Sequence, residues 1–461
     1  MWSVNELHLR GDKMAKTPTN VDEVDAEPTK AFFIDMLTRD IPLDQAILDL
    51  VDNSVDGAKA MSAGGGDSFE NRKVALEFGK DSFRIIDNCG GFGKEAARTY
   101  AFKFGRPAGA ERTPHSIGQF GVGMKRALFK FGKHFIVRSA TTKESWEVEV
   151  PVSTWETQQG WHFPFSTFKG KGEISSKNPG TEIVVSELRP EVSSRFALSS
   201  FQNLIFDLIK SKHRQFISEG LSITVNGKHV DATNLFLLMG DGLTPGTDTL
   251  EFQDKGKAPI SVRIIVGIGP SSPRQAGWYV VCNGRVILEA DRSPITGWGA
   301  VEEEAGRILM PSFHNQFARF RGIAFFDSAD SSQVPWNTTK TSVDQDNKYW
   351  QAAFARMLEM MRPVINFLNE LDADIDEYSR EESPLNQFVS KTPTVRPETL
   401  QKKAAFKAPA RTSFVKGPKT VKIQYSRPVA DVELLQDALG VSSAKAVGET
   451  TFDAALRRQK R

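Results

Sequence analysis

Three short polar and glycine-rich segments in the first half of the chain constrain its fold more than any other feature. The first is DLVDNSVD at residues 49–56, inside a helical pattern. The second is the turn DNCGGFG at residues 87–93, after a strand pattern, and the third is the loop GQFGVG at residues 118–123, before another helical pattern. Each segment alone is weak evidence. In this order, they predict a single nucleotide-binding pocket.

The composition is that of a protein able to bury a full hydrophobic core. Of 461 residues, 39% are hydrophobic and 25% are charged, and this length predicts about three domains. The formal net charge of +2 means that any nucleic-acid surface must be local. Two cysteines, Cys89 and Cys282, are too few for a disulfide framework or a zinc site and fit a reducing cytosol, so we expect a cytoplasmic protein. No apolar run approaches the roughly 20 residues that cross a bilayer, so no membrane partner is expected.

Helix and strand patterns alternate over residues 29–190, which predicts an α/β fold, a two-layer α+β sandwich with mostly antiparallel strands. The helical patterns lie at residues 31–37, 43–61 and 122–131, and the strand patterns at residues 73–78, 83–87, 134–140, 146–150 and 182–187.

A second α/β domain is predicted at residues 191–371, ending in a long helix at residues 349–371. Residues 372–420 are expected to be a linker that is disordered from Thr392 onward, because Pro, Ala, Lys and Arg dominate and large apolar residues are few. The remaining expectations are a flexible arm at residues 1–28, a helix at 201–217, strands at 221–225, 262–266, 278–281 and 322–326, and a C-terminal module at 421–461 with a strand at 421–425 and a helix at 429–439.

The first polar segment offers a metal ligand and a base. Magnesium takes a few hard oxygen ligands together with waters and phosphate oxygens, so the amide oxygen of Asn53 suffices. Asp49 lies one helical turn earlier on the same face, where it can orient or deprotonate a water. Asp56 continues the polar stripe. A solvated acidic face on a surface helix is the competing interpretation, which the flanking apolar residues disfavour.

The second segment offers a base-recognition group. Asp87 ends the strand pattern at residues 83–87, so its carboxylate is expected to be buried and to need a donor, for which the exocyclic amino group of adenine is suitable. Gly90, Gly91 and Gly93 would let the backbone approach the base without a Cβ clash. Taken alone, an ordinary Asp-Gly turn would be the better interpretation.

The third segment offers an anion site. Its backbone amides and the helix that follows can bind phosphate, and Lys125 adds a positive charge one turn inside that helix. Residues 101–117 are expected to be a lid that shields the site from water. For the loop at residues 118–123, the alternative interpretation is a flexible hairpin before a core helix. Thr181 is a further candidate for the wall of the adenine pocket. The loop residues assigned to ATP binding are Gly118, Gln119, Phe120, Gly121, Val122 and Gly123.

Together the segments resemble the GHKL superfamily of ATPases, which includes gyrase-type topoisomerases, ninety-kilodalton heat-shock chaperones, MutL proteins, MORC proteins and sensor histidine kinases. The resemblance extends over residues 29–371. It implies a Bergerat-type ATP-binding fold followed by a transducer-like α/β domain, with ATP and Mg²⁺ bound. The loop at residues 118–123 looks like the lid segment of the MORC proteins and the chaperones, and its continuation at residues 124–135 looks more like that of MORC.

The resemblance also carries over at positions outside the loop. Gly180-Thr181 is similar to the family element that closes the pocket. PWNTTKT at residues 335–341 lies where clamp-type members carry a lysine that reaches the γ-phosphate, and Lys340 is the best match, which makes it a catalytic candidate beside Asp49. The family usually has Glu where Asp49 stands, and a misplacement of about 1 Å can cost on the order of 100-fold in rate. Cys89 replaces a family glycine, and we expect it only to fill space.

The resemblance implies a magnesium-dependent hydrolase that converts ATP to ADP and phosphate and acts as an ATP-gated dimeric clamp or remodelling factor on a nucleic-acid or protein client. The homodimer would form when ATP binds. Alternatives are a heat-shock-type chaperone, a histidine-kinase-like phosphotransferase and a binding module with a degenerate site, although Asn53 and Lys125 argue against degeneracy. The segment at residues 391–422, with nine Lys or Arg against Glu398, is a candidate DNA-binding segment. A solvated tether is its alternative.

Overall fold

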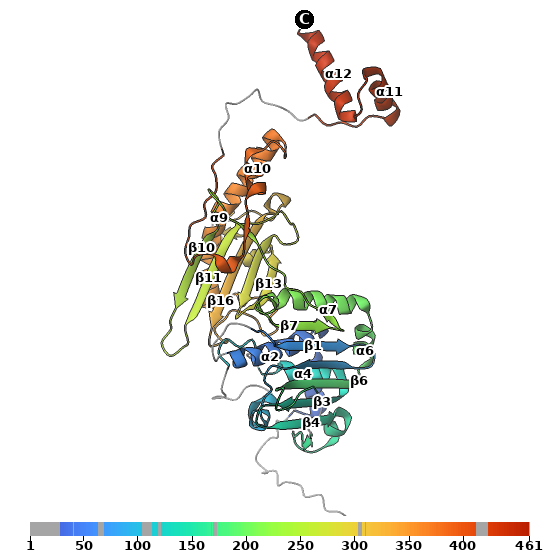
Figure 1. Cartoon of the computed structure of the whole chain (residues 1–461), viewed down its shortest axis with the longest axis vertical. Coiled ribbons are helices and arrows are strands. Elements are labelled where there is room, and N and C mark those ends of the chain that lie inside the picture. The colour runs from blue at the N-terminus through green and yellow to red at the C-terminus, as the bar shows by residue number, and fades with distance from the viewer. Residues whose placement is uncertain are drawn as a thin grey trace, which may run out of the picture. The chain divides into compact units, whose positions relative to one another are not determined.

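The computed structural model of the chain divides into two compact units, Met1–Pro409 and Ala410–Arg461, and each is described by itself (Figure 1). The structure describes residues 28–39, 41–62, 69–103, 113–118, 121–166, 168, 173–302, 307–308, 310–411 and 423–460. The expected arm at residues 1–28 lies almost entirely outside these ranges.

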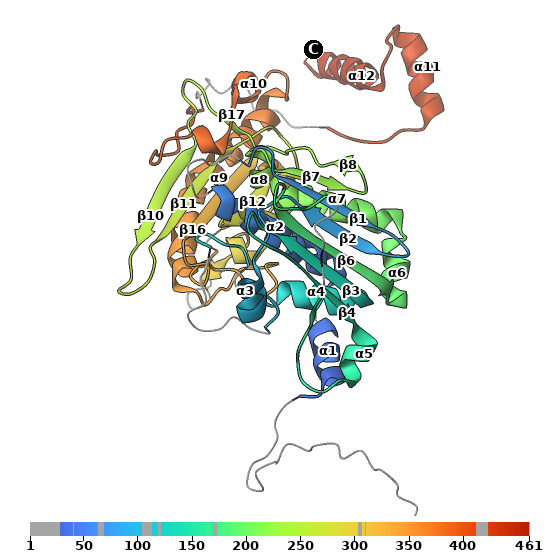
Figure 2. The ribbon, with the colours of Figure 1, turned by 60° about the horizontal axis from the view of Figure 1, so that its bottom comes forward.

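An eight-stranded sheet forms the first layer of unit 1, in the order β5-β4-β3-β6-β2-β1-β7-β8. Figure 2 shows β4, β3, β6, β2 and β1 side by side. All neighbouring pairs are antiparallel except β1 and β7, which are parallel. The strands are β1 (Lys73–Phe78), β2 (Phe83–Asp87), β3 (Gly132–Ala140), β4 (Ser145–Pro151), β5 (Phe165–Ser166), β6 (Gly180–Leu188), β7 (Ser222–Val225) and β8 (Lys228–His229).

The helices within residues 30–218 of unit 1 provide the second layer. Their bounds are α1 (Lys30–Arg39), α2 (Leu43–Ser62), α3 (Lys94–Ala96), α4 (Gly123–Phe131), α5 (Val152–Thr157), α6 (Pro190–Phe196), α7 (Ser199–Lys212) and α8 (Arg214–Ser218), with a π-helical turn at Ala97–Ala101. In α2, fully buried Ile47, Val51, Val55 and Ala58 recur at helical spacing. Burying each Ile or Val contributes roughly 1.5–3 kcal/mol, which outweighs the at most about 0.7 kcal/mol that such a residue costs in a helix. Tertiary packing therefore holds α2.

Strand alternation sets which side chains face the helices. Phe83, Ile85 and Asp87 occupy every second position of β2, and all three are buried. Because side chains of a strand alternate between its faces, Asp87 shares the buried face with two apolar residues. The sequence pattern predicted β1 and β2 with these bounds, and it also predicted the burial of Asp87.

The expected boundary between two domains at residue 190 is wrong, because the first sheet continues beyond it. Strand β7 pairs in parallel with β1, with Lys73 opposite Ser222, and β8 extends the sheet further. The connection runs through α6 and α7, and α7 buries Phe201, Ile205 and Ile209 (Figure 1). The sequence shows that residues 221–225 form a strand, but the strand pattern carries no information about its partner.

A five-stranded sheet in the order β10-β11-β16-β12-β13 forms the second part of unit 1. Its strands are β10 (Gly246–Phe252), β11 (Ile260–Ile268), β12 (Gly277–Cys282), β13 (Arg285–Asp291) and β16 (Phe320–Ser328). The long helix α9 (Lys348–Tyr378) is capped by Asn347, whose side chain accepts hydrogen bonds from the amides of Tyr349 and Trp350. It extends beyond the expected end at residue 371. Short elements complete the part: β9 (Leu237–Leu238), β14 (Val301–Glu302), β15 (Arg307–Ile308), α10 (Pro384–Lys391), β17 (Thr394–Val395) and 3-10 turns at Pro294–Thr296, Asn315–Phe317 and Pro397–Thr399.

The expectation of a disordered linker is wrong for residues 392–411. Strand β17 pairs with β9, and the backbones of Thr244 and Lys407 are joined by hydrogen bonds of 2.9 and 3.0 Å. The guanidinium of Arg263 also donates to the carbonyl of Leu400 over 2.8 Å. Backbone pairing, which composition does not reveal, supplies most of this order. Residues 412–422 lie outside the described ranges.

Unit 2 contains two helices, α11 (Val429–Leu439) and α12 (Ala444–Gln459). The expected helix at residues 429–439 is present. Residues 423–425 form no strand in the structure, and residues 421–422 are not described. Among the described residues of this unit, Val447 is the one buried hydrophobic side chain, so the unit has almost no core of its own.

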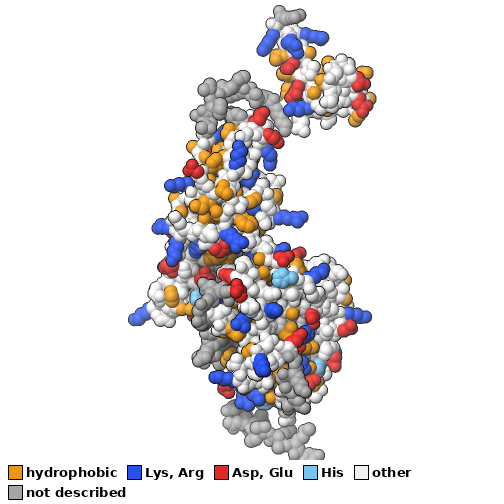
Figure 3. Space-filling view, in the orientation of Figure 1, with side chains coloured by type: hydrophobic (Ala, Val, Ile, Leu, Met, Phe, Trp, Pro, Cys, Tyr) orange, Lys and Arg blue, Asp and Glu red, His pale blue; other side chains and the backbone are white. Residues whose placement is uncertain are grey.

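The distribution of surface charge is consistent with the small net charge of the chain. On the face shown in Figure 3, Lys and Arg side chains are interspersed with Asp and Glu. Within the part of the chain that the structure describes, no helix is long and apolar enough to cross a membrane.

Candidate nucleotide-binding site

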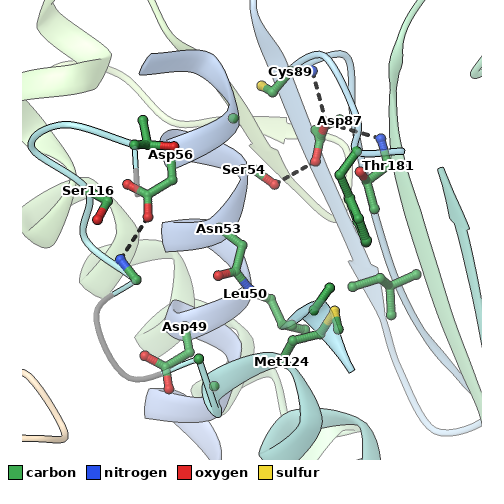
Figure 4. Close-up of a pocket in the computed structure, with 18 of the residues that line it drawn as sticks. Asp49, Leu50, Asn53, Ser54, Asp56, Asp87, Cys89, Ser116, Met124 and Thr181 are labelled. Atoms are coloured by element: carbon green, nitrogen blue, oxygen red, sulfur yellow. Dashed lines mark hydrogen bonds between the residues drawn. The ribbon is translucent and has the colours of Figure 1, made fainter. Parts of the chain in front are cut away.

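A cavity of about 540 Å³ lies where α2, β2 and the start of α4 meet (Figure 4). Its volume falls within the range of roughly 300–1,000 Å³ that is typical of small-molecule sites. The cavity brings together twelve of the fifteen residues expected from the sequence: Asp49, Asn53, Asp56, Asp87, Gly91, Gly118, Gly121, Val122, Gly123, Lys125, Thr181 and Lys340.

The three remaining expected residues are not part of this lining. Gly93 precedes α3, and a Cβ built there would lie 2.5 Å from a carboxylate oxygen of Glu144. It therefore packs beside the β3–β4 turn. Gln119 and Phe120 lie outside the described residues.

One face of α2 points into the cavity. Asp49, Asn53 and Asp56 recur at i, i+4 and i+7, which places them on one side of the helix, and Figure 4 shows them above one another. The side chain of Asn53 is exposed to the cavity. The carboxylate of Asp56 binds the backbone: its two oxygens accept hydrogen bonds from the amides of Ile117 and Gly118, each over 2.7 Å. Asp56 therefore fixes the loop that begins the third segment.

Asp87 lies at the other end of the cavity and is held by three donors. Its Oδ2 accepts from the Ser54 hydroxyl over 2.8 Å, and its Oδ1 accepts from the amides of Cys89 and Thr181 over 2.9 and 3.2 Å (Figure 4). Burial raises the pKa of the Asp87 carboxyl above its ordinary value, and these hydrogen bonds offset that rise only in part. Because each carboxylate oxygen can accept about two hydrogen bonds, Oδ2 can also accept from a ligand amino group. Ser54 was not predicted from the sequence, because it lies within the polar segment but carries no charge to mark it.

Gly91 is a glycine for a reason other than approach to a base. Its φ is +61°, and a Cβ there would lie 2.2 Å from the carbonyl oxygen of Ala140 and 2.7 Å from that of Gly180. The turn after β2 thus packs directly on the backbones of β3 and β6. That contact needs a residue without a side chain.

The third segment lies against the first. Helix α4 begins at Gly123, where a Cβ would lie 3.0 Å from the Cβ of Asp49, so the amides at the start of α4 are close to the polar face of α2. Lys125 is 2% exposed, and its ammonium donates to the carbonyls of Ala101 and Lys103 over 2.8 and 2.6 Å. Burial lowers the pKa of Lys125 to about 7. In this structure Lys125 binds backbone carbonyls on the cavity wall, a contact that the sequence did not predict.

Lys340 enters the cavity from the second part of unit 1. Its ammonium lies 2.9 Å from Oδ1 of Asp49 and 2.8 Å from Oδ2 of Asp52. The other oxygen of Asp52 accepts from His213 Nε2 over 2.8 Å and from Arg285 Nε over 2.9 Å. Four segments of the chain therefore meet at one buried charge cluster. It consists of Asp49 and Asp52 on α2, His213 between α7 and α8, Arg285 at the start of β13, and Lys340 in the turn at residues 335–341.

Burial and charge act against each other in this cluster. Burial raises the pKa of Asp52, but Arg285, Lys340 and His213 together hold it well below its usual range. For Lys340 burial lowers the pKa, and the two carboxylates more than offset it, so the pKa is raised. Burial and the charge of Arg285 lower the pKa of His213 to about 4. The imidazole is therefore neutral at pH 7 and donates through Nε2.

Asp52, His213 and Arg285 were not predicted from the sequence as residues of the site. Asp52 lies within the first segment, but it is fully buried beside Asp49 and does not line the cavity. His213 and Arg285 stand in ordinary helix and strand patterns. No local signal marks them, because their partner is 161 and 233 positions away respectively.

The donor set fits a magnesium ion held mainly by phosphates and water. Within the described residues no group of three or more His, Cys, Asp or Glu side chains is able to hold a metal ion. The exposed amide of Asn53 offers one oxygen beside the carboxylate of Asp49. Magnesium bound with a nucleotide takes one or two protein ligands and keeps several waters, and this site matches that requirement.

Residues 41–181 match the family model described as histidine kinase-, DNA gyrase B- and HSP90-like ATPase. The match contains all three sequence segments and supports a GHKL-type ATPase domain that binds and hydrolyses ATP. The mixed α/β architecture of this part is consistent with such a domain. Lys340, Arg285 and His213 lie outside the matched range. No curated protein matches the chain.

Proposed function

We propose that this protein is a magnesium-dependent ATPase in which Lys340 is needed for turnover, and that it works as an ATP-gated dimeric clamp or remodelling factor. The observation that carries the proposal is the position of Lys340. It reaches the cavity from a segment 291 positions away from Asp49 and pairs with that carboxylate there. A cation placed beside the expected base has a clear use if the cavity receives the terminal phosphate of ATP.

Each residue of the site has a role in this proposal. The amide oxygen of Asn53 would hold Mg²⁺, which supplies neutralising charge to the phosphates when bound. Asp49 orients the attacking water and accepts its proton. Asp87 accepts a hydrogen bond from the adenine amino group, with Thr181 beside it. The amides at the start of α4 face the phosphates.

Dimerisation would follow from the same contact. ADP has no γ-phosphate for the ammonium of Lys340 to meet, so only ATP would change how the second part of unit 1 is held against α2. Hydrogen bonds hold both ends of the expected lid near the site. At one end, the carbonyls of Ala101 and Lys103 accept from Lys125. At the other end, the amides of residues 117 and 118 donate to Asp56. The expected lid at residues 101–117 is otherwise mostly outside the described residues.

Light scattering of the full chain tests this proposal. A non-hydrolysable ATP analogue should shift the protein toward dimer, and ADP should not. Lys340→Ala should still bind ATP but lose the shift and most turnover. Lys348→Ala, an exposed lysine at the start of α9 that pairs with Asp254, is the matched control and should behave like the wild type. A protein that remains monomeric with the analogue bound has no ATP-gated clamp, and a Lys340→Ala variant with normal turnover has no catalytic lysine at this position.

The basic segment supports a nucleic-acid client. Lys391, Arg396, Lys402, Lys403 and Lys407, all within the described residues 391–411, are exposed in the structure. Phosphate contacts by such residues weaken steeply with salt. The affinity for duplex DNA should therefore fall as the salt concentration rises. Replacing Lys402, Lys403 and Lys407 by Ser should make the plot of log affinity against log salt concentration less steep, by about 0.9 for each phosphate that is no longer neutralised. Unchanged DNA binding in this variant, or none in the wild type, would favour a protein client.

A further inference from the structure

We infer that Asp52 is a positioning residue of this site, which holds the ammonium of Lys340 at the cavity. The inference rests on the proposed role of Lys340 in turnover. Asp52 is 0% exposed and is not among the residues that line the cavity, whereas Lys340 lines it. Asp52 therefore cannot touch a bound nucleotide and can act on one only through Lys340.

The carboxylate of Asp52 is fixed from two sides. Its Oδ1 receives His213 and Arg285, and its Oδ2 receives Lys340. The four side chains are at most 6% exposed, and charge-assisted hydrogen bonds in such surroundings are stronger than in water. Turning the carboxylate away from Lys340 would break the bonds to His213 and Arg285 as well. Asp52 is thus a rigid acceptor for the ammonium.

The hydrogen-bond capacity of Lys340 explains what this rigidity does. An ammonium has three donors, and the described residues take two of them, through Asp49 and Asp52. A phosphate oxygen can accept the third donor or replace Asp49. If it replaces Asp49, that carboxylate becomes available to a water, while Asp52 still holds the ammonium in place.

Loss of Asp52 should therefore lower turnover more than binding. Without it, Asp49 would be the one carboxylate left to pair with Lys340, and a base held in an ion pair cannot also serve a water. The opposing interpretation is that Asp52 merely ties α2 to the second part of unit 1. That role would change the amount of folded protein and would not depend on Lys340.

A double-mutant cycle on the full chain separates these interpretations. Asp52→Asn, Lys340→Met and the double variant are assayed for kcat and KM with Mg-ATP, and calorimetric binding of the nucleotide counts the folded sites. Asp52→Asn should lower kcat about 10- to 100-fold, the worth of a hydrogen bond to a charged group, with KM changed less than about threefold. The double variant should have the same kcat as Lys340→Met alone. Asp44→Asn, in the first turn of α2 and outside the cavity, is the control.

Three outcomes would overturn the inference. If Asp52→Asn lowers kcat equally in the wild-type and Lys340→Met backgrounds, Asp52 does not act through Lys340. If Lys340→Met is impaired and Asp52→Asn is not, the inference alone fails and the proposed function stands. If Lys340→Met turns over like the wild type, both fail.

His213 gives a second test, because Asp52→Asn leaves the charge of Arg285 buried without its partner and can unfold the protein. His213→Gln keeps a donor for Oδ1 of Asp52, and His213→Leu removes it. The Leu variant should lower kcat by about 3- to 10-fold, the net worth of one hydrogen bond, with KM unchanged, and the Gln variant should retain the wild-type kcat. Equal kcat values for the two variants would overturn the inference.

Discussion

The ammonium of Lys340 lies 2.9 Å from a carboxylate oxygen of Asp49, although 291 positions separate the two residues. Asp49 belongs to the range matched by the ATPase family model, and Lys340 does not. The pair therefore joins the nucleotide domain to the part of the chain that follows it.

Asn53→Ala should abolish magnesium-dependent ATP binding. The Asn53 amide is exposed to the cavity, and it supplies the side-chain oxygen proposed for the metal. Calorimetric titration with ATP in the presence and absence of Mg²⁺ measures the effect. Asn369→Ala, which removes an exposed amide on α9, should bind like the wild type. Wild-type affinity of the Asn53 variant in Mg²⁺ would remove this residue from the metal site.

Asp49→Asn should leave ATP bound and lower hydrolysis by roughly 10²–10⁴-fold, the usual contribution of a positioned general base. The amide retains the size of the side chain but cannot accept the proton from water. Single-turnover phosphate release measures the chemical step, and Asp44→Asn on the same helix is the control. Equal rates in the wild type and the Asp49 variant would assign the base to another residue.

Asp87→Asn should weaken ATP binding and reduce the preference for ATP over GTP. Three donors, from Ser54, Cys89 and Thr181, face this carboxylate. An amide NH₂ would leave one of them without an acceptor and would turn a donor toward the site of the adenine amino group. Competition binding of both nucleotides measures the ratio, with Asp81→Asn in the exposed turn before β2 as the control. An undiminished ratio would mean that another group recognises the base.

The buried imidazole of His213 should make stability depend on pH. Its pKa falls from 6.5 to about 4 in the folded protein, so between these values the unfolded chain binds the additional proton. Stability therefore rises as pH increases from 4 to 6.5 and is fully present above that range. At about 1.4 kcal/mol for each pKa unit, the loss at pH 4 is about 3 kcal/mol.

The difference in unfolding free energy between the wild type and His213→Gln, measured in denaturant at several pH values, isolates this contribution. Gln keeps a donor for Asp52 but does not titrate, so the variant should gain stability relative to the wild type as pH falls from 6.5 to 4. His229→Gln, on the exposed strand β8, should show no such trend. A pH-independent difference for the His213 variant would mean that His213 keeps its ordinary pKa when folded.

The sequence by itself determined the helix and the strand that carry the carboxylate and amide groups Asp49, Asn53, Asp56 and Asp87 of the cavity. The spacing of Asp49, Asn53 and Asp56 places them on one face of α2 because a helix has 3.6 residues per turn. The alternation in β2 likewise turns Asp87 to the buried face. These are local rules, and a stretch of a few residues contains all the information that they use.

Only the tertiary structure decided which distant groups meet at those positions. It brought Lys340, His213 and Arg285 to Asp52, paired β7 with β1, and ordered residues 392–411 through backbone hydrogen bonds. It also gave Lys125 two backbone carbonyls as partners. No periodicity in one segment can specify the partner of a charge or of a strand edge, because that partner is set by the path of the chain between them. The charge cluster at the cavity is therefore a property of the fold, whereas the nucleotide-binding motifs are already present in the sequence.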